Sequence, residues 1–121
     1  MLSNEFDYEE LKWQPRFGIK QYKDAIYRGE IEERKRKGKG VMVYFSGRIY
    51  EGDWVIDKRE GRGYEYFING NTYQGEFRNN KAHGKGCYSW KNGEVYDGEW
   101  IDGVKEGYGV WRGVNGDSYI G

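Results

Sequence analysis

The chain has 121 residues, 20 of them glycine, and aromatic and charged residues make up 18% and 33% of the sequence. Glycine at this density argues against a helical bundle, because each glycine inside a helix costs about 1 kcal/mol, and no apolar run approaches the roughly 18 residues of a membrane-spanning helix. Lysine and arginine (20) balance aspartate and glutamate (20), which argues against a nucleic-acid-binding protein, since such proteins usually carry a basic surplus.

The N-terminal segment 1–26 shows no regular repeat. Its residues 4–13 favour a short helix, with Asn4 as the N-cap, Asp7 in the first turn and Pro15 ending it. Residues 21–26 resemble the end of a degenerate copy of the repeat that follows, although Asp24 stands where later copies carry a turn glycine. We expect 1–26 to cap the repeats; a disordered tail and a partner-binding segment are the alternatives.

From residue 27 onward the sequence repeats every 23 residues. Each copy begins with a tyrosine that is followed two residues later by a glycine, and further glycines keep the same period. A period of this length is typical of stacked repeat architectures. The tyrosines are Tyr27, Tyr50, Tyr73, Tyr96 and Tyr119, and the copies are 27–49, 50–72, 73–95 and 96–118, with 119–121 beginning a fifth.

Each copy is predicted to be a β-hairpin. The first strand has the pattern Tyr-x-Gly-acid-aromatic, which alternates between the two faces of a sheet, and a polar loop such as 78–83 follows it. The second strand opens with Gly-x-Gly, and Asn-Gly pairs at 69–70, 92–93 and 115–116, with a weaker Ser-Gly at 46–47, predict type I′ turns. The predicted fold is therefore all-β: an elongated, single-layer antiparallel β-meander of stacked hairpins.

Aromatic side chains recur on one face of the predicted sheet. Glycine inside a strand weakens it unless another group approaches closely, so we expect the tyrosine and tryptophan rings to lie over the Gly-x-Gly segments and to form the core. If some rings instead stay exposed, they provide a stripe that binds a partner. The residues of this stripe are Tyr27, Tyr50, Trp54, Tyr73, Phe77, Tyr96 and Trp100.

The sequence offers no combination of residues for catalysis or for metal binding. The only histidine, His83, is placed in a turn, and the only cysteine, Cys87, is placed in a strand as a packing residue. Cys87 cannot form an internal disulfide, which favours a cytoplasmic protein. The Gly-x-Gly segments lack the third glycine of a dinucleotide loop. We therefore expect no enzyme activity, no cofactor and no metal. The periodic acids Glu30, Asp53, Glu76 and Glu99 are expected to face solvent and to pair with Lys39, Arg62 or Lys85.

A basic cluster marks the predicted loop of the first copy. It consists of Arg34, Lys35, Arg36 and Lys37, continued by Lys39. One interpretation is a contact for an anionic surface, either phospholipid or an acidic protein. The other is a solvated loop that neighbouring glutamates partly neutralise.

The last residues begin a strand that stops after three positions. Tyr119 and Ile120 would then belong to an unprotected sheet edge, and an exposed edge can pair with another chain. Three interpretations remain open: the native chain continues, the edge pairs with a partner or with a second copy of this chain, or the end is frayed.

The repeat resembles that of the MORN-repeat family (membrane occupation and recognition nexus), whose 23-residue unit reads Tyr-x-Gly-acid-Trp, then Gly-x-Gly, then Gly. Residues 27–118 match it four times. The resemblance implies an extended β-meander and a non-enzymatic scaffold that binds partner proteins, in a cytoskeletal or ciliary axonemal assembly such as a radial spoke. It leaves open a peripheral membrane module that binds anionic phospholipid and an accessory domain of a larger enzyme.

Overall fold

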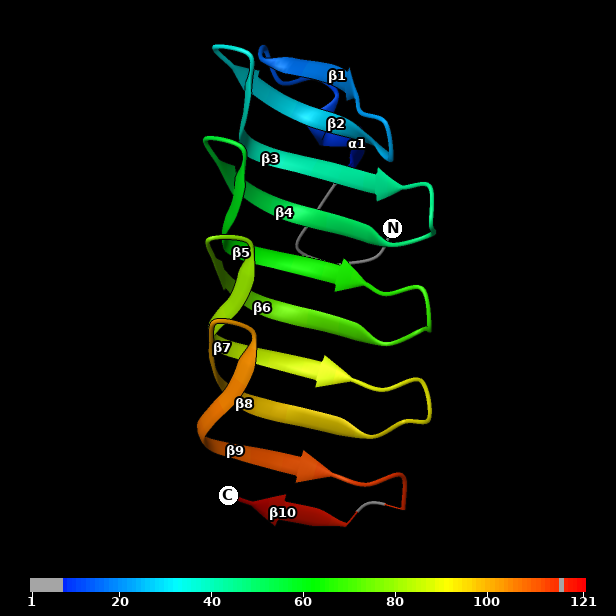
Figure 1. Cartoon of the computed structure of the whole chain (residues 1–121), viewed down its shortest axis with the longest axis vertical. Helices are drawn as coiled ribbons and strands as arrows, with labels where there is room; N and C mark the ends of the chain where they lie inside the picture. Colours follow the sequence, from blue (N-terminus) through cyan, green and yellow to red (C-terminus); the bar gives the residue numbers. More distant parts are fainter. Residues whose placement is uncertain (1–7, 116) are drawn as a thin grey trace.

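The computed structural model describes residues 8–115 and 117–121. One short helix, α1 (Tyr8–Leu11), precedes a single sheet of ten antiparallel strands that follow one another in chain order (Figure 1). This confirms the predicted all-β, single-layer meander. The strands are β1 (Phe17–Gln21), β2 (Ala25–Glu32), β3 (Lys35–Tyr44), β4 (Ile49–Val55), β5 (Lys58–Tyr66), β6 (Thr72–Arg78), β7 (Lys81–Ser89), β8 (Val95–Ile101), β9 (Val104–Arg112) and β10 (Ser118–Ile120).

The sheet starts before the predicted repeats. Strand β1 pairs with β2, and the Tyr22 N–H donates to the Ala25 carbonyl oxygen at 2.8 Å, so Asp24 does not prevent a tight turn. The predicted boundary at Tyr27 therefore falls inside the sheet. The predicted helix 4–13 is described only from Tyr8, and it ends at Leu11. Asn4 and Asp7 lie outside the described residues.

The predicted polar loop inside each copy is wrong, because a two-residue turn takes its place. In the third copy only Asn79 and Asn80 form the turn, with φ of 50° and 69°, and Lys81 already begins β7. Ile56 and Asp57 form the equivalent turn with φ of 44° and 66°. Two consecutive residues at positive φ define the type I′ turn, whose twist matches that of the strands.

The Asn-Gly pairs form a different turn from the one predicted. At 69–70 only Gly70 has positive φ, 92°. The Gly70 N–H donates to the Phe67 carbonyl oxygen at 3.0 Å, and the Phe67 N–H donates to that of Asn71 at 2.9 Å. This is the three-residue loop in which a left-handed glycine follows a type I turn. Ser46-Gly47 and Asn92-Gly93 follow the same scheme, whereas Gly116 lies outside the described residues.

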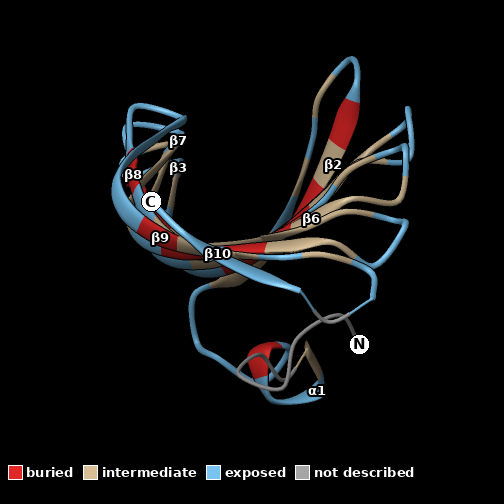
Figure 2. Cartoon of the chain, turned by 90° about the horizontal axis from the view of Figure 1, so that it is seen from below, coloured by how far each residue is buried: buried red, intermediate tan, exposed pale blue. Residues whose placement is uncertain are grey.

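The two ends of the hairpins rise from a common floor, so that the sheet is U-shaped in cross-section and α1 lies outside the U (Figure 2). A register shift interrupts the pairing within each copy, as between Gly52 and Trp54, and such bulges bend strands. Asp53 holds the bulge: its Oδ2 accepts the Arg62 N–H at 3.0 Å. Glu30 and Glu76 accept the N–H groups of Lys39 and Lys85 in the same way. The acids therefore accept hydrogen bonds from the backbone. A side-chain ion pair of the predicted kind also forms, with the Lys39 Nζ 2.5 Å from the Asp53 Oδ1.

The aromatic rings form a continuous core along one face, which we call the inner face. The tyrosine that begins each complete copy places its ring over a glycine of the neighbouring strand, as Tyr73 lies over Gly86, which confirms the predicted role of the second glycine in Gly-x-Gly. Successive rings meet edge to face, with centroids 5.1 to 5.6 Å apart, the arrangement that aromatic pairs favour. The order is Tyr27, Trp54, Tyr50, Phe77, Tyr73, Trp100, Tyr96.

Candidate binding groove

The inner face is hollowed along the array. One recess of about 580 Å³ lies at the C-terminal end, between Tyr96, Lys105, Trp111 and Tyr119. A second, of about 300 Å³, lies over the middle copies, and its walls include residues of β5, β6, β7 and β8. Both recesses are lined by inner-face residues, so this is the concave side of the U seen in Figure 2. An open groove of this kind accommodates an extended partner better than it encloses a small molecule.

The seven rings of the predicted partner-binding stripe are buried. Their exposed fractions run from 0% for Tyr27 and Tyr50 to 7% for Tyr96 and Trp100, and burial raises the pKa of the Tyr27, Tyr50 and Tyr73 hydroxyls. The stripe is therefore corrected from a broad contact surface to the core that forms the floor of the groove. A partner in the groove would touch mainly the residues that surround these rings, and would reach a ring only where it lines one of the two recesses, as Tyr73, Tyr96 and Trp100 do.

The polar atoms of the core rings are used within the sheet. The hydroxyl of Tyr73 donates to the Glu76 carbonyl oxygen at 2.9 Å, and the Trp100 indole N–H donates to the Gly86 carbonyl oxygen at 3.1 Å. Equivalent bonds recur in the first and second copies. Because a buried hydroxyl or indole without a partner destabilises the fold, these bonds fix the rings in place.

Basic side chains cover the aromatic core at intervals of 23 residues. The guanidinium of Arg36 lies 4.5 Å from the centroid of the Trp54 ring. That of Arg59 lies 5.4 Å from the centroid of Phe77, and the Lys105 ammonium lies 4.9 Å from that of Trp111. These are cation–π distances. Positions 36, 59 and 105 follow the period of the sequence. They were not recognised as part of the sheet because the polar composition of this stretch predicted a loop in each copy.

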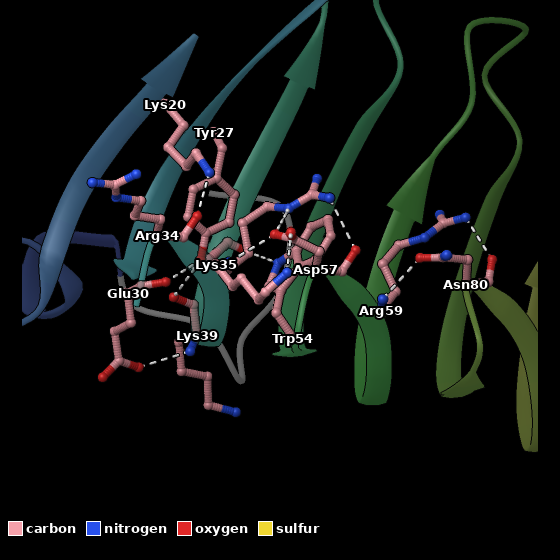
Figure 3. A network of polar contacts seen from close by, with 12 residues as sticks. Lys20, Tyr27, Glu30, Arg34, Lys35, Lys39, Trp54, Asp57, Arg59 and Asn80 are labelled. Atoms are coloured by element: carbon pink, nitrogen blue, oxygen red, sulfur yellow. Dashed lines mark hydrogen bonds and ion pairs between the residues drawn. The ribbon is translucent and has the colours of Figure 1, made fainter. Parts of the chain in front are cut away.

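Turn residues of the next copy hold the two arginines. Asp57 Oδ1 accepts from the Arg36 Nε at 3.1 Å, and the Asp57 carbonyl oxygen accepts from a terminal nitrogen of Arg36 at 2.9 Å. The Asn80 carbonyl oxygen accepts from Arg59 at 2.5 Å (Figure 3). Arg59 also pairs with Glu65 at 2.9 Å. Glu65, a residue that is only 4% exposed, lines the groove, and the sequence pattern did not indicate it.

The basic cluster of the first copy is not a loop. Arg34 belongs to a two-residue turn, and Lys35, Arg36, Lys37 and Lys39 lie on or beside the bulged part of β3. Arg36 faces the groove, and its side chain is 16% exposed, whereas the lysines remain about half exposed. Acids lie close to them: Lys37 pairs with Glu32 at 3.2 Å, and Lys35 lies 3.9 Å from Asp57. Arg36 is therefore separated from the rest of the cluster, which stays exposed, and neighbouring acids neutralise part of the charge.

The predicted edge residues form the last strand. Tyr119 pairs with Trp111 and Ile120 with Val110, and their side chains are 61% and 79% exposed. Pairing of this edge with another chain stays a prediction.

Of the lone histidine and the lone cysteine, the cysteine lies in a strand as predicted and the histidine does not lie in the predicted turn. His83 lies in β7 rather than in a turn, with its Nδ1 3.8 Å from an Asp102 oxygen. Cys87 is half-buried in β7, and burial raises the pKa of its thiol. In the part of the chain that the structure describes, no three His, Cys, Asp or Glu residues gather as metal ligands do. No helix within those same residues has the length and apolar character needed to cross a membrane.

The comparison with protein families agrees with this geometry. A family model described as MORN repeat matches residues 27–47, 50–72, 73–95 and 96–118. A search of the curated proteins finds no match. MORN repeats are modules that typically bind proteins or membranes and are generally non-catalytic. Since the matches cover most of the sequence and the strands follow the same period, the chain belongs to the MORN-repeat family.

Proposed function

We propose that the protein is a non-enzymatic scaffold that holds a partner protein in its inner groove. The observation that carries this proposal is the groove itself, which is open, runs across consecutive repeats and has a rigid aromatic floor. Rigid floors favour binding because little conformational freedom is lost when the partner docks. The outer face has a smaller recess, of about 230 Å³, whose walls include the charged residues Arg62, Lys85 and Asp97.

Photo-crosslinking tests which face the partner uses. Phe67 lines the groove, and its neighbour Tyr66 points to the outer face. Each is replaced in turn by p-benzoylphenylalanine, and the native complex is irradiated. We expect the partner to crosslink to position 67, while the same probe at position 66, the last residue of β5, gives no more than background. Equal or reversed yields would contradict groove binding.

The proposed setting is a cytoskeletal assembly, with a ciliary axoneme as the specific case. This part rests on the family alone, because its repeats often occur in such structures. Extraction of cells with detergent and then with high salt, followed by mass spectrometry, tests it. Retention of the protein in the detergent-insoluble pellet supports the setting, and full release with the membrane fraction contradicts it.

A second candidate function is the binding of anionic phospholipid at the first copy, favoured by the exposure of Arg34, Lys35 and Lys37. Each cation near a charged membrane supplies about 1 kcal/mol. Arg34→Ala/Lys35→Ala/Lys37→Ala is therefore expected to weaken binding to phosphatidylserine vesicles about 100-fold in a sedimentation assay. Arg36 is left in place because it packs on Trp54.

The control for this experiment removes the same charge from the third copy. Arg78, Lys81 and Lys85 are all exposed. Their triple replacement by alanine should leave vesicle binding within a few-fold of the unmodified protein. An equal loss in both variants would indicate nonspecific attraction and would contradict a lipid site at the first copy.

A further inference from the structure

The series of cations over the aromatic core is interrupted once. Positions 36, 59 and 105 carry Arg36, Arg59 and Lys105, but the equivalent position of the third copy is Ala82. In residues 8–115 and 117–121 no cation lies over the Tyr73 or Trp100 ring. The recess of about 300 Å³ lies at this position, with Ala82, Tyr73 and Trp100 among its walls.

The backbone around Ala82 has the same geometry as at the occupied positions. The Gly103 N–H donates to the Ala82 carbonyl oxygen at 2.8 Å. The same bond joins Asp57 to Arg36 at 3.0 Å and Asn80 to Arg59 at 3.1 Å. In those two copies the carbonyl oxygen of the turn residue, Asp57 or Asn80, then accepts from the arginine side chain. The Gly103 carbonyl holds the same place in the fourth copy, but alanine has no donor to reach it.

The walls of the recess suit a cationic group. Tyr73 and Trp100 correspond by period to Tyr50 and Phe77, the two rings that Arg59 covers. Tyr88 supplies a third ring, 6.1 Å from Trp100. Aromatic-lined pockets bind cations through the ring quadrupole, more strongly where water is excluded.

The charges around the recess are mixed. Asp102 is an exposed carboxylate at the rim, and Lys81 is an exposed ammonium there. Arg48 and Arg59 also line the recess, but both are paired with the Glu65 carboxylate. The two paired arginines and their acid leave one net positive charge, and the rim adds one charge of each sign. Recognition must therefore come from the rings and from the Gly103 carbonyl rather than from long-range attraction.

We propose that this pocket, defined by Ala82, Tyr73, Tyr88, Trp100 and Gly103, receives an arginine side chain of the partner protein. The proposal rests on the proposed function, since it specifies what the partner inserts into the groove. Arginine is chosen over lysine because Arg36 and Arg59 are the side chains that contact a ring and a turn carbonyl at the same time. A planar guanidinium can stack on a ring while its edge donates hydrogen bonds.

The test titrates the whole protein with N-acetyl-L-arginine amide and follows the tryptophan indole N–H signals by NMR. We expect the Trp100 signal and the Gly103 amide signal to shift and to saturate together. N-acetyl-L-citrulline amide, which has the same shape without the charge, should bind at least 10-fold more weakly. Equal shifts with both compounds, or shifts that do not involve Trp100, would overturn the proposal.

The variant Ala82→Arg supplies the missing guanidinium from the chain itself. It is expected to raise Tm by about 4 °C and to weaken binding of the arginine amide at least 10-fold. Ala82→Lys, which supplies an ammonium like that of Lys105, serves the same purpose if the arginine variant does not fold. The control Ser118→Arg adds the same charge at an exposed position of β10 and should leave binding unchanged. Undiminished binding in both Ala82 variants would overturn the proposal.

The two proposals fail separately. Crosslinking at position 67 without binding of the arginine amide would leave groove binding intact and overturn the arginine pocket. Binding of the amide that Ala82→Arg abolishes, combined with crosslinking only at position 66, would show that the pocket binds arginine, but it would overturn the groove as the partner's site and the partner as the source of that arginine.

Discussion

Replacement of Gly86 by alanine is expected to lower the free energy of unfolding by about 4 kcal/mol. A Cβ at this position would lie 2.0 Å from the Tyr73 hydroxyl oxygen and 2.3 Å from its Cζ. The ring cannot withdraw, because it is 2% exposed and is held between Phe77 and Trp100. Denaturant unfolding followed by tryptophan fluorescence measures the effect.

Two control variants separate the possible causes. Gly103 has open space around it but a φ of +85°, so Gly103→Ala should cost only about 1 kcal/mol of backbone strain. Gly121 has neither a close neighbour nor such a φ, so Gly121→Ala should stay within about 0.5 kcal/mol of the unmodified protein. If Gly86→Ala loses no more stability than Gly103→Ala, the position of the Tyr73 ring does not require the absence of a side chain at Gly86.

The second large effect concerns Glu51, a carboxyl group buried in β4. Its side chain is on the face opposite to the rings, the residue is 5% exposed, and its Oε1 has no hydrogen-bond partner within the described residues. Burial raises the pKa of Glu51 from 4.5 to about 7. Between these values the folded state keeps a proton that the unfolded state has lost, so stability falls as pH rises. The expected loss is about 3 kcal/mol by pH 8.

The isosteric variant Glu51→Gln should abolish this dependence. Glutamine stays neutral at every pH, so above pH 7 the variant is expected to be more stable than the unmodified protein by up to about 3 kcal/mol. The chain already carries a glutamine, Gln74, at the equivalent position one copy later. Asp97→Asn, at the exposed equivalent in the fourth copy, is the control and should leave the pH profile unchanged. If the stability of Glu51→Gln changed with pH in the same way as that of the unmodified protein, the proposed effect of the Glu51 carboxyl group would be refuted.

Much of the fold follows from the period in the sequence, and the errors concern turns. The rule that type I′ turns need Asn-Gly assigned them to the wrong end of each hairpin. In the structure these turns lie at 33–34, 56–57, 79–80 and 102–103. Asn79-Asn80 and Asp102-Gly103 are residue types that favour positive φ, whereas Ile56 rarely adopts it. The turns are stabilised by the preceding copy, because the Asp57 N–H donates to the Arg36 carbonyl oxygen at 3.0 Å. Such a contact between copies is not visible in the local sequence.

The site was predicted in part for the same reason. Burial of rings such as Tyr50 follows from the pattern of tyrosine and glycine. The packing of Arg36, Arg59 and Lys105 over the rings does not follow from that pattern, because composition alone assigns these residues to a loop. Strand β1 was also missed, since its sequence has lost the glycine pair that marks the other copies.

The strand order has a consequence for how the protein opens. Among the described residues, every strand from β1 to β10 pairs only with the strands next to it in the sequence, and β1 does not pair with β10. Loss of β10 or β1 therefore removes one ladder of bonds and leaves the rest of the sheet intact, as in other linear repeat proteins. Amide hydrogen exchange should then be fastest in the two terminal strands, β1 and β10, and slowest in the middle of the sheet. A partner that spans several copies would hold neighbouring strands together and would slow amide exchange in every copy that it contacts.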